Sequence, residues 1–406
     1  MNLGKITEIT KKVTFLKNYS SLLMPIVIIV VGIFLFIPVQ LMSSGLKKQI
    51  EKESASVGRK IKSLSGGTVS REQWKVEEEY QKAFASEANQ TSVIMKQSSE
   101  RELLSYKLFP ELKDTSTLIF KEFGQLYCSG IDNFLVNINA HDCPTEVEIA
   151  RSLQKSSLTG GSDSSQQATR LSEVEATIVD ALCKSRARSA SVYINATDLA
   201  GYSFWSNYEY IGMDQAIRDC WYWQLGYWII EDVLHTVGEF NSGTTSVFES
   251  PVKRLLYVNF TTRSRSEANR NDVMPKYITS SKEILFLPHT ARISNEGMDI
   301  VQFEFSVIIR ADEIVPFIKK LCSSKEHKFS GFNKELPEAP YKHNQISILG
   351  LDVEAFDVQD ATHKFYRYGD DAIVQLTLSC EYIFGKSSYD AIKPTVIKQG
   401  GETKSE

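Results

Sequence analysis

An unbroken run of apolar residues near the N-terminus is the strongest hydrophobic pattern in the chain. It extends from Leu22 to Met42, and no charged residue stands between Lys17 and Lys47. A helix rises about 1.5 Å per residue, so about 20 apolar residues cross a hydrocarbon core of about 30 Å. The run is longer than the apolar region of a cleaved secretory signal, and a poor cleavage site follows it. The pattern favours a permanent membrane anchor over a cleaved signal or a buried core helix.

The transmembrane helix is predicted at residues 21–42, after a cytoplasmic stub at 1–20. The side chains expected to face lipid include Leu22, Ile26, Ile29, Phe34, Phe36 and Leu41. Lysines flank both ends of the run, so the positive-inside rule alone does not give the orientation. The stub is too short to fold, whereas the remainder is a large polar chain. We therefore expect a single-pass protein of the inner membrane with a periplasmic body; a body facing the cytosol is the alternative.

A helical stripe continues beyond the apolar run. Leu46, Ile50, Val57, Ile61 and Leu64 recur at spacings of three, four and seven residues, with Lys and Glu between them. This spacing places them on one face of a helix. Ile50, Val57, Ile61 and Leu64 are therefore predicted to contact a partner helix in a coiled-coil-like arrangement. A helix packed against its own body is the alternative.

The segments between this stripe and the body are less regular. A second helical pattern starts at Ser70 and ends at Pro110, which gives a helical stalk over residues 43–112. Residues 113–170 combine mixed structure with a linker rich in Ser, Gly and Gln. No phosphate-binding motif follows the glycines in this linker.

The body at residues 171–390 alternates between strand and helix patterns. Every second residue is apolar at 301–310 and 374–384, which is typical of strands with one buried face. Further strands are predicted at 190–196, 252–262, 283–293 and 346–356, and helices at 214–238 and 314–321. This order favours an α+β fold with ferredoxin-like, split βαβ modules, in which helices cover one face of an antiparallel sheet. Residues 391–406 are predicted to be a disordered tail.

Together, these features resemble the PilO family of type IV pilus assembly proteins and the related GspM-type proteins of type II secretion. The resemblance rests on the plan of Leu22–Met42, Leu46–Leu64 and Val301–Phe384, because the family has no catalytic signature. It implies a non-enzymatic platform subunit that pairs with a PilN-like or PilO-like single-pass protein, or with itself, at the inner-membrane lipid. The chain is about twice the usual length of the family, and residues 114–240 have no counterpart in it.

An aromatic cluster at residues 205–228 suggests an alternative function. It contains four of the five tryptophans, with Tyr202, Tyr208, Tyr210, Tyr222 and Tyr227 alongside. Aromatic side chains next to Asn, Asp and Gln can stack on sugar rings, as in a module that binds cell-wall glycans. The same residues also fit the core stripe of one long helix, with Trp223 and Tyr227 packed on a second element or exposed to a partner protein.

Composition and charge exclude several other functions. Hydrophobic residues make up 42% and charged residues 24%, as in ordinary globular proteins. The formal net charge of -4 gives no general attraction to nucleic acid. No catalytic, cofactor-binding or metal site is predicted: no two histidines stand three or four residues apart, and the adjacent residues His141, Asp142 and Cys143 do not make a triad. Among the six cysteines, Cys128 and Cys143 are a possible disulfide.

Overall fold

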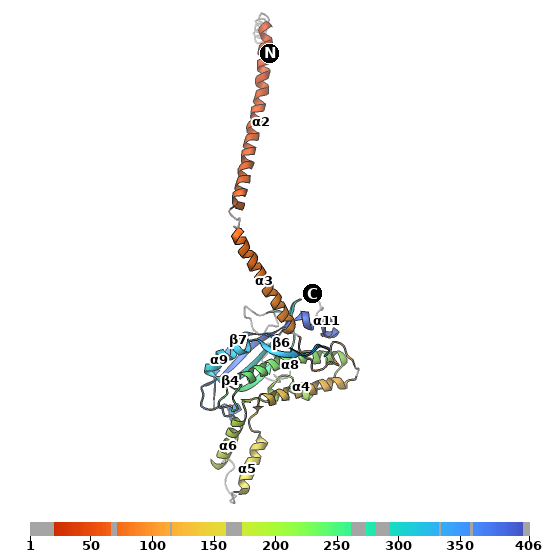
Figure 1. Cartoon of the computed structure of the whole chain (residues 1–406), viewed down its shortest axis with the longest axis vertical. Helices are drawn as coiled ribbons and strands as arrows, with labels where there is room; N and C mark the ends of the chain where they lie inside the picture. Colours follow the sequence, from red (N-terminus) through yellow and green to blue (C-terminus); the bar gives the residue numbers. More distant parts are fainter. Residues whose placement is uncertain are drawn as a thin grey trace, which may run out of the picture. The chain divides into compact units, whose positions relative to one another are not determined.

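The computed structural model describes residues 20–65, 71–98, 100–113, 116–159, 173–260, 273–280, 292–332, 334–357 and 360–400. The chain divides into two compact units, residues 1–87 and residues 88–406. Helix α2 (Ser20–Ser65) and most of helix α3 (Arg71–Ser98) belong to the first unit. The sheets and the remaining helices belong to the second unit (Figure 1).

Helix α2 continues from the apolar run into charged sequence without a break. In the described part of the chain, no helix is both long and apolar enough to cross a membrane. The transmembrane helix predicted at 21–42 is therefore wrong: the stretch is the first half of a longer helix that carries Lys47, Lys48 and further charges up to Ser65. Of the predicted lipid-facing side chains, Ile29 is exposed. The side chains of Leu22, Ile26, Phe34, Phe36 and Leu41 lie outside the described ones.

Helix α3 ends earlier than the predicted stalk. Its last residue is Ser98, and residues 100–113 contain no helix. Leu103, Leu108 and Phe109 are buried in the core of the second unit. The apolar positions that suggested a helix up to residue 112 therefore reflect burial of an irregular segment of turns and bends.

The described part of the second unit contains eight strands and, besides the end of α3, eight α-helices. The helices are α4 (Leu118–Asn137), α5 (Glu146–Thr159), α6 (Glu173–Ser189), α7 (Tyr202–Ser206), α8 (Met213–Phe240), α9 (Ile314–Leu321), α10 (Lys386–Tyr389) and α11 (Thr395–Gly400). The strands are β1 (Ala140–His141), β2 (Val192–Tyr193), β3 (Val252–Asn259), β4 (Met298–Arg310), β5 (Lys325–Phe329), β6 (Ala339–His343), β7 (Ile346–Ala355) and β8 (Ile373–Gly385).

The main sheet has six strands in the order β1-β2-β3-β4-β8-β7. Strands β1, β2 and β3 are parallel, whereas every later pairing in this sheet is antiparallel. Two helical crossovers produce the parallel half, since α5 and α6 link β1 to β2, and α7 and α8 link β2 to β3. The fold is thus α+β with a mixed sheet, and the predicted ferredoxin-like antiparallel sheet is wrong. Strands β1 and β2 are too short to show an alternating pattern in the sequence.

The centre of the sheet is the long antiparallel pair of β4 and β8. The two strands stay in register from Met298 opposite Gly385 to Arg310 opposite Ile373. The apolar face of the pair includes Phe303 and Phe305, both fully buried. Polar residues on the other face, such as Glu381, are buried as well. The period of two therefore indicated the two faces of each strand correctly, but not their exposure to solvent.

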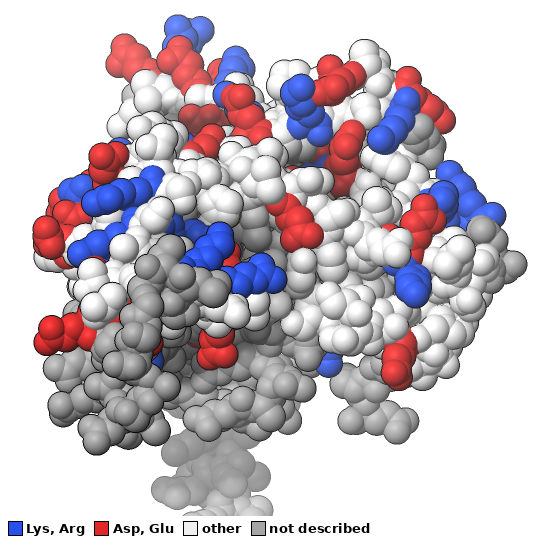
Figure 2. Space-filling view, turned by 90° about the horizontal axis from the view of Figure 1, so that it is seen from below, with Lys and Arg blue, Asp and Glu red and all other residues white. Residues whose placement is uncertain are grey.

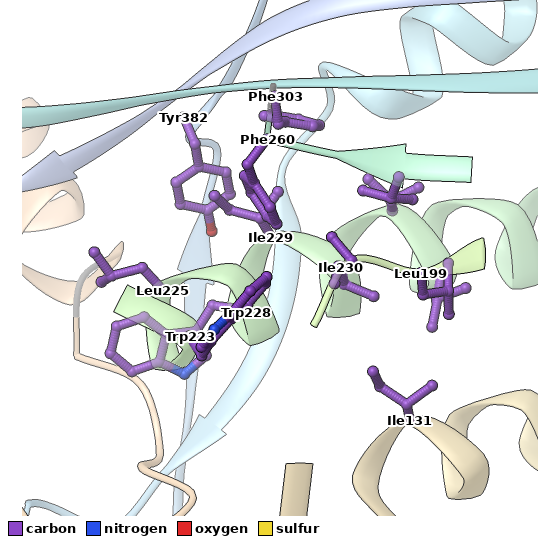
Figure 3. Close-up of a cluster of buried hydrophobic side chains, with 14 of the residues drawn as sticks. Ile131, Leu199, Trp223, Leu225, Trp228, Ile229, Ile230, Phe260, Phe303 and Tyr382 are labelled. Atoms are coloured by element: carbon purple, nitrogen blue, oxygen red, sulfur yellow. The ribbon is translucent and has the colours of Figure 1, made fainter. Parts of the chain in front are cut away.

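Helix α8 lies between this sheet and helix α4. Large apolar side chains surround it on nearly all sides, which is typical of a buried helix. Leu225 and Ile229 lie on its sheet side, near Tyr382 and Phe303, while Ile131 of α4 lies on the opposite side (Figure 3). The core of the unit is therefore built around one helix.

Helices α5 and α6 form a pair with a small core of their own. They lie side by side (Figure 1), and Ile149, Val179 and Cys183 are buried between them and Phe365. The linker predicted around residues 153–170 instead continues α5 to Thr159. Its remainder lies outside the described residues, as do residues 1–19 of the predicted cytoplasmic stub and residues 283–291 of a predicted strand.

The C-terminal segment is attached to the core rather than disordered from residue 391. Ile392 and Ile397 are buried, and the Lys393 Nζ lies 2.6 Å from Asp299 Oδ2. The Tyr389 hydroxyl donates to the same carboxylate. The predicted tail is therefore wrong for residues 391–400, while residues 401–406 lie outside the described part.

Candidate interaction surface

Helix α2 exposes the apolar side chains that the sequence places on one face. Leu46 is exposed, and Ile50 and Val57 have 58% and 52% of their surface exposed. Ile50 and Val57 are seven residues apart, which is two turns of a helix. The backbones of Ile61 and Leu64 continue this helix, but their side chains lie outside the described ones. The described side chains of this face thus form a narrow apolar stripe open to solvent.

Helix α3 has an apolar face as well. Val76, Tyr80 and Phe84 follow each other at four-residue spacing, and all three are exposed. Trp74 also has 64% of its surface exposed, but it lies on the side of the helix that carries Glu78 and Gln81. Two i,i+4 contacts, from Lys82 to Glu78 and from Gln81 to Glu77, mark the solvated side of the helix. Exposed aromatic side chains of this size are typical of residues that contact another protein.

The other predicted interface residues lie in the core. Trp223 is fully buried, with its ring against Tyr127, Phe204 and Phe260. Tyr227 is half-buried and packs on the rings of Tyr127 and Phe134. Trp223 is therefore unavailable to a partner, and Tyr227 is largely used within the fold.

The other three tryptophans of the 205–228 cluster are also part of the core, whereas Tyr210 is exposed. Trp205, Trp221 and Trp228 are buried. The Trp228 Nε1 donates to the Glu102 carbonyl at 2.9 Å, and the Trp221 Nε1 donates to the Tyr277 hydroxyl at 2.8 Å. Stacking on a sugar ring needs an exposed aromatic face. The tryptophans that suggested glycan binding have none.

The segment that follows α3, residues 100–104, is bound by several parts of the body, and we call it the connector. The Glu100 carbonyl lies 2.8 Å from His327 Nε2, and the Leu104 N–H donates to Gln224 Oε1 at 2.8 Å. With the Glu102 contact to Trp228, these bonds bring the connector to α8 and to the β5–β6 hairpin. Its backbone is therefore held at successive residues.

The Arg101 side chain anchors the connector in a buried polar network. Its guanidinium donates to Glu231 and to the Tyr382 hydroxyl, and lies 3.0 Å from Asp232 Oδ1. Arg101 and Asp232 are almost fully buried. The His343 Nε2 lies 3.1 Å from both Asp232 oxygens. The charges of this network thus compensate one another.

Electrostatics in the network favours fixed charges over proton transfer. Burial raises the pKa of Asp232, but the Arg101 cation and His343 outweigh this and hold the pKa well below its usual range. Burial raises the pKa of Tyr382 far above its usual value. Burial, with the Arg101 cation, lowers the pKa of His327 to about 4. None of these three groups is poised to exchange a proton near neutral pH, so the network serves attachment better than acid-base catalysis.

The stability of the body should therefore fall in acid. A histidine whose folded pKa is depressed contributes stability that is present above its unfolded pKa of about 6.5 and is lost as the pH falls toward 4. Asp232 acts with the same sign at lower pH. Glu231 opposes both, since burial raises its pKa. We expect the free energy of unfolding to decrease between pH 6.5 and 4, as measured by urea denaturation.

The control for this pH dependence uses two histidine variants. His327→Gln should reduce the decrease between pH 6.5 and 4, because one titrating histidine is gone, while His343, whose pKa burial also lowers, remains. His141→Gln should leave it unchanged, since His141 is exposed on β1. Equal slopes for wild type and His327→Gln would contradict the assignment.

A second polar cluster forms where β1 and β2 end. Asp142 accepts hydrogen bonds from the Tyr366 hydroxyl at 2.6 Å and from Asn195 Nδ2 at 2.8 Å. The Arg254 guanidinium stacks 3.7 Å over the Tyr366 ring. Burial raises the pKa of Cys143, which makes the thiol a poor nucleophile. Asp142 thus ties the loop around Tyr366 to the sheet.

The predicted disulfide is absent. All six cysteines are free, Cys128 and Cys143 among them. Cys128 on α4 lies near the Tyr202 carbonyl, while Cys143 follows β1 and lies near Tyr366. The two thiols therefore have separate surroundings.

Sequence reasoning missed the Arg101 network almost entirely. An acidic residue on a helix usually faces solvent, yet Asp232 is buried. One local signal existed: Asp232 stands among Trp228, Ile229 and Val233, on a helix whose neighbours are apolar. The other members come from distant segments, with Arg101 and Tyr382 separated by 281 residues.

The surface charge of the body is mixed on the face drawn in Figure 2. Lys and Arg side chains alternate there with Asp and Glu. A nucleic-acid backbone needs a broad positive surface, and this face offers none. Among the described residues, no group of three His, Cys, Asp or Glu side chains fits a metal ion.

Comparisons with known proteins add no relative. No protein-family model, no curated protein and no solved structure matches the chain. The function of this protein is therefore inferred from the side chains described above.

Proposed function

We propose that this protein is a structural subunit that acts by binding another protein chain through the exposed apolar faces of α2 and α3. The observation that carries the proposal is the exposure of Ile50, Val57, Tyr80 and Phe84 on helices without apolar cover. Full burial of one large aliphatic side chain is worth about 1.5–3 kcal/mol. Long single helices in water gain most of their stability from packing an apolar face. A partner helix supplies that packing.

The body supports this function by holding the connector that follows α3 rather than by catalysis. Its two polar clusters are occupied by their own members, and each fastens a loop or the connector to the core. The aromatic cluster is used for packing. In this proposal α2 and α3 bind the partner, and the body fixes the connector that follows α3.

The system in which the subunit works stays a prediction. The resemblance to pilus and secretion platforms rested on a membrane span, a stalk stripe and a ferredoxin-like body. Of these, the stripe is the feature that the described residues retain. The proposal therefore concerns the mode of action, which is pairing through helices.

Site-specific photocrosslinking in cells tests the proposal. Benzoylphenylalanine in place of Ile50 or Val57 should give a crosslinked product of one defined mass after illumination. The same residue in place of Ala55, which is exposed on the opposite face of α2, should give none. Ile50→Asp combined with Tyr80→Asp should abolish the product formed from position 57. Equal crosslinking at positions 55 and 57, or none at either, would refute the proposal.

A further inference from the structure

Strand β7 is the edge of the main sheet at the end opposite β1. It pairs with β8 alone, and no other backbone group among the described residues bonds to it. Edge strands are usually short, or carry Pro or Lys, and thereby resist pairing with other chains. Strand β7 has ten residues and contains neither Pro nor Lys. It therefore presents a row of unpaired N–H and C=O groups to a further strand.

The half of β7 that follows its bulge is regular and open to solvent. The register shifts between Ile348 and Gly350, and from Leu351 to Ala355 each residue stands opposite one residue of β8. All five of these residues are exposed, and we call them the open edge. The pairing with β8 determines on which face of the sheet each of their side chains lies. The chemistry of the two faces is therefore fixed by the fold.

The first face of the open edge is apolar and incompletely covered. Leu351 and Val353 stand opposite Leu378 and Leu376 of β8, on the face that packs on the core. The two leucines of β8 are fully buried, whereas Leu351 and Val353 have 49% and 43% of their surface exposed. A further strand with apolar side chains on this face would cover both of them, because side chains of neighbouring strands pack in cross-strand pairs.

The second face of the open edge is acidic. Asp352 and Glu354 stand opposite Thr377 and Gln375, and both carboxylates are exposed. The Gln375 Nε2 donates to Glu354 Oε2 at 3.3 Å, and no cation pairs with either carboxylate among the described residues. Two negative charges two residues apart on one face match cations at every second residue of an added strand.

These charges disfavour a second copy of β7 as the added strand. When the open edge pairs with that of another copy, antiparallel and over its full length, Asp352 of each copy faces Glu354 of the other. Like charges directly opposite each other in a sheet are destabilising. Strand β1, at the other edge of the sheet, has two residues and is too short to serve. The strand that fits therefore carries charges of the other sign.

From the unpaired backbone and the two faces, we infer that β7 is a second binding surface, which accepts an extended segment of a partner protein as an added strand. In that segment apolar side chains alternate with Lys or Arg. The apolar ones cover Leu351 and Val353, and the cations lie beside Asp352 and Glu354. Main-chain hydrogen bonds supply the affinity, and the alternation supplies the specificity. This surface goes beyond the pairing proposed for α2 and α3 and does not depend on it.

Anisotropy titrations of fluorescein-labelled peptides with the full-length chain test the inference. A mild detergent keeps the apolar run at 22–42 in solution. The basic peptide Ser-Val-Lys-Val-Lys-Val-Ser should bind, and its counterpart with Glu in place of Lys should bind at least about tenfold more weakly. The basic peptide with every amide N-methylated should not bind, because it cannot donate main-chain hydrogen bonds. In hydrogen-exchange mass spectrometry, the basic peptide should slow the exchange of the open edge.

A charge swap locates the site. The variant D352K/E354K should reverse the preference and bind the acidic peptide more tightly. The variant E209K/E296K makes the same change in formal charge at two exposed positions outside β7 and β8, and should still prefer the basic peptide. Tryptophan fluorescence verifies that both variants are folded, and the exchange measurement on wild type does not depend on either.

Several outcomes would overturn the inference. These are binding of neither peptide, equal binding of both, and binding of the N-methylated peptide as tight as that of its parent. Reversal of the preference by E209K/E296K, or protection confined to amides outside β7, would place the binding elsewhere and overturn it as well. None of these results bears on the crosslinking from Val57, so the proposed function is tested separately.

Discussion

Replacing Arg101 with methionine is expected to lower the free energy of unfolding of the body by about 3–5 kcal/mol. The guanidinium is the partner of the buried Asp232 and the partly buried Glu231, and also donates to the Tyr382 hydroxyl. Without it, Asp232 keeps its negative charge in a buried site and loses its nearest cation, while His343, Tyr382 and the more distant Lys325 compensate it in part. An uncompensated buried charge is among the most destabilising changes in a protein. The effect should appear as a lower midpoint in urea denaturation followed by tryptophan fluorescence.

The control for Arg101 is an ion pair at the surface. Lys107 and Glu122 are exposed and lie 2.8 Å apart, so Lys107→Met should change the free energy of unfolding by less than about 1 kcal/mol. Asp232→Asn in the Arg101→Met background should recover part of the loss, since it removes the unpaired charge. A loss below about 1 kcal/mol for Arg101→Met alone would show that the network does not hold the connector.

Trp223→Ala is expected to destabilise the body by about 3–5 kcal/mol without acting on the helices of the first unit. The indole is fully buried and contacts Tyr127 of α4, Phe204 of α7 and Phe260 after β3. Its removal leaves a cavity that three separate elements line. The remaining buried tryptophans report the loss of the folded state by fluorescence.

Trp74→Ala is the control for Trp223→Ala, because it removes the same side chain from an exposed position. Trp74 is exposed on α3, so the free energy of unfolding should change by about 0.5 kcal/mol or less. The crosslinking at Val57 should survive Trp223→Ala wherever the variant remains folded. If Trp223→Ala were as mild as Trp74→Ala, the assignment of the aromatic cluster to the core would be wrong.

The sequence predicted those elements whose signal is local and periodic. Strands β4 and β8 alternate over many residues, and α8 and α9 carry apolar side chains at helical spacing, so all four were found near their observed bounds. Strands β1 and β2 are two residues each and carry no periodicity. The hydrophobic pattern therefore did not predict the parallel half of the sheet, and the mixed topology was missed as well. The β5–β6 hairpin was missed because Lys, Glu and His dominate its sequence.

The candidate site shows the same division. Ile50 and Val57 were predicted because their spacing on one helix is a local property, and both are exposed. Trp223 carries no mark that distinguishes a core tryptophan from one at an interface, since this depends on what α4 and α7 place against it. The connector was missed because its partners lie on α8, the β5–β6 hairpin and β8. Such contacts depend on tertiary structure and leave no periodic signal.

The contact between Arg101 and Tyr382 has a consequence for the order of events during biosynthesis. The two residues are 281 positions apart, and β8, which carries Tyr382, inserts between β4 and β7. At about 5–20 residues per second, a ribosome needs roughly 15–60 s to add that stretch. Throughout this interval α2 and α3 have already emerged while the central sheet is unfinished. Under the proposed function, the nascent helices are therefore open to a partner chain before β8 completes the sheet.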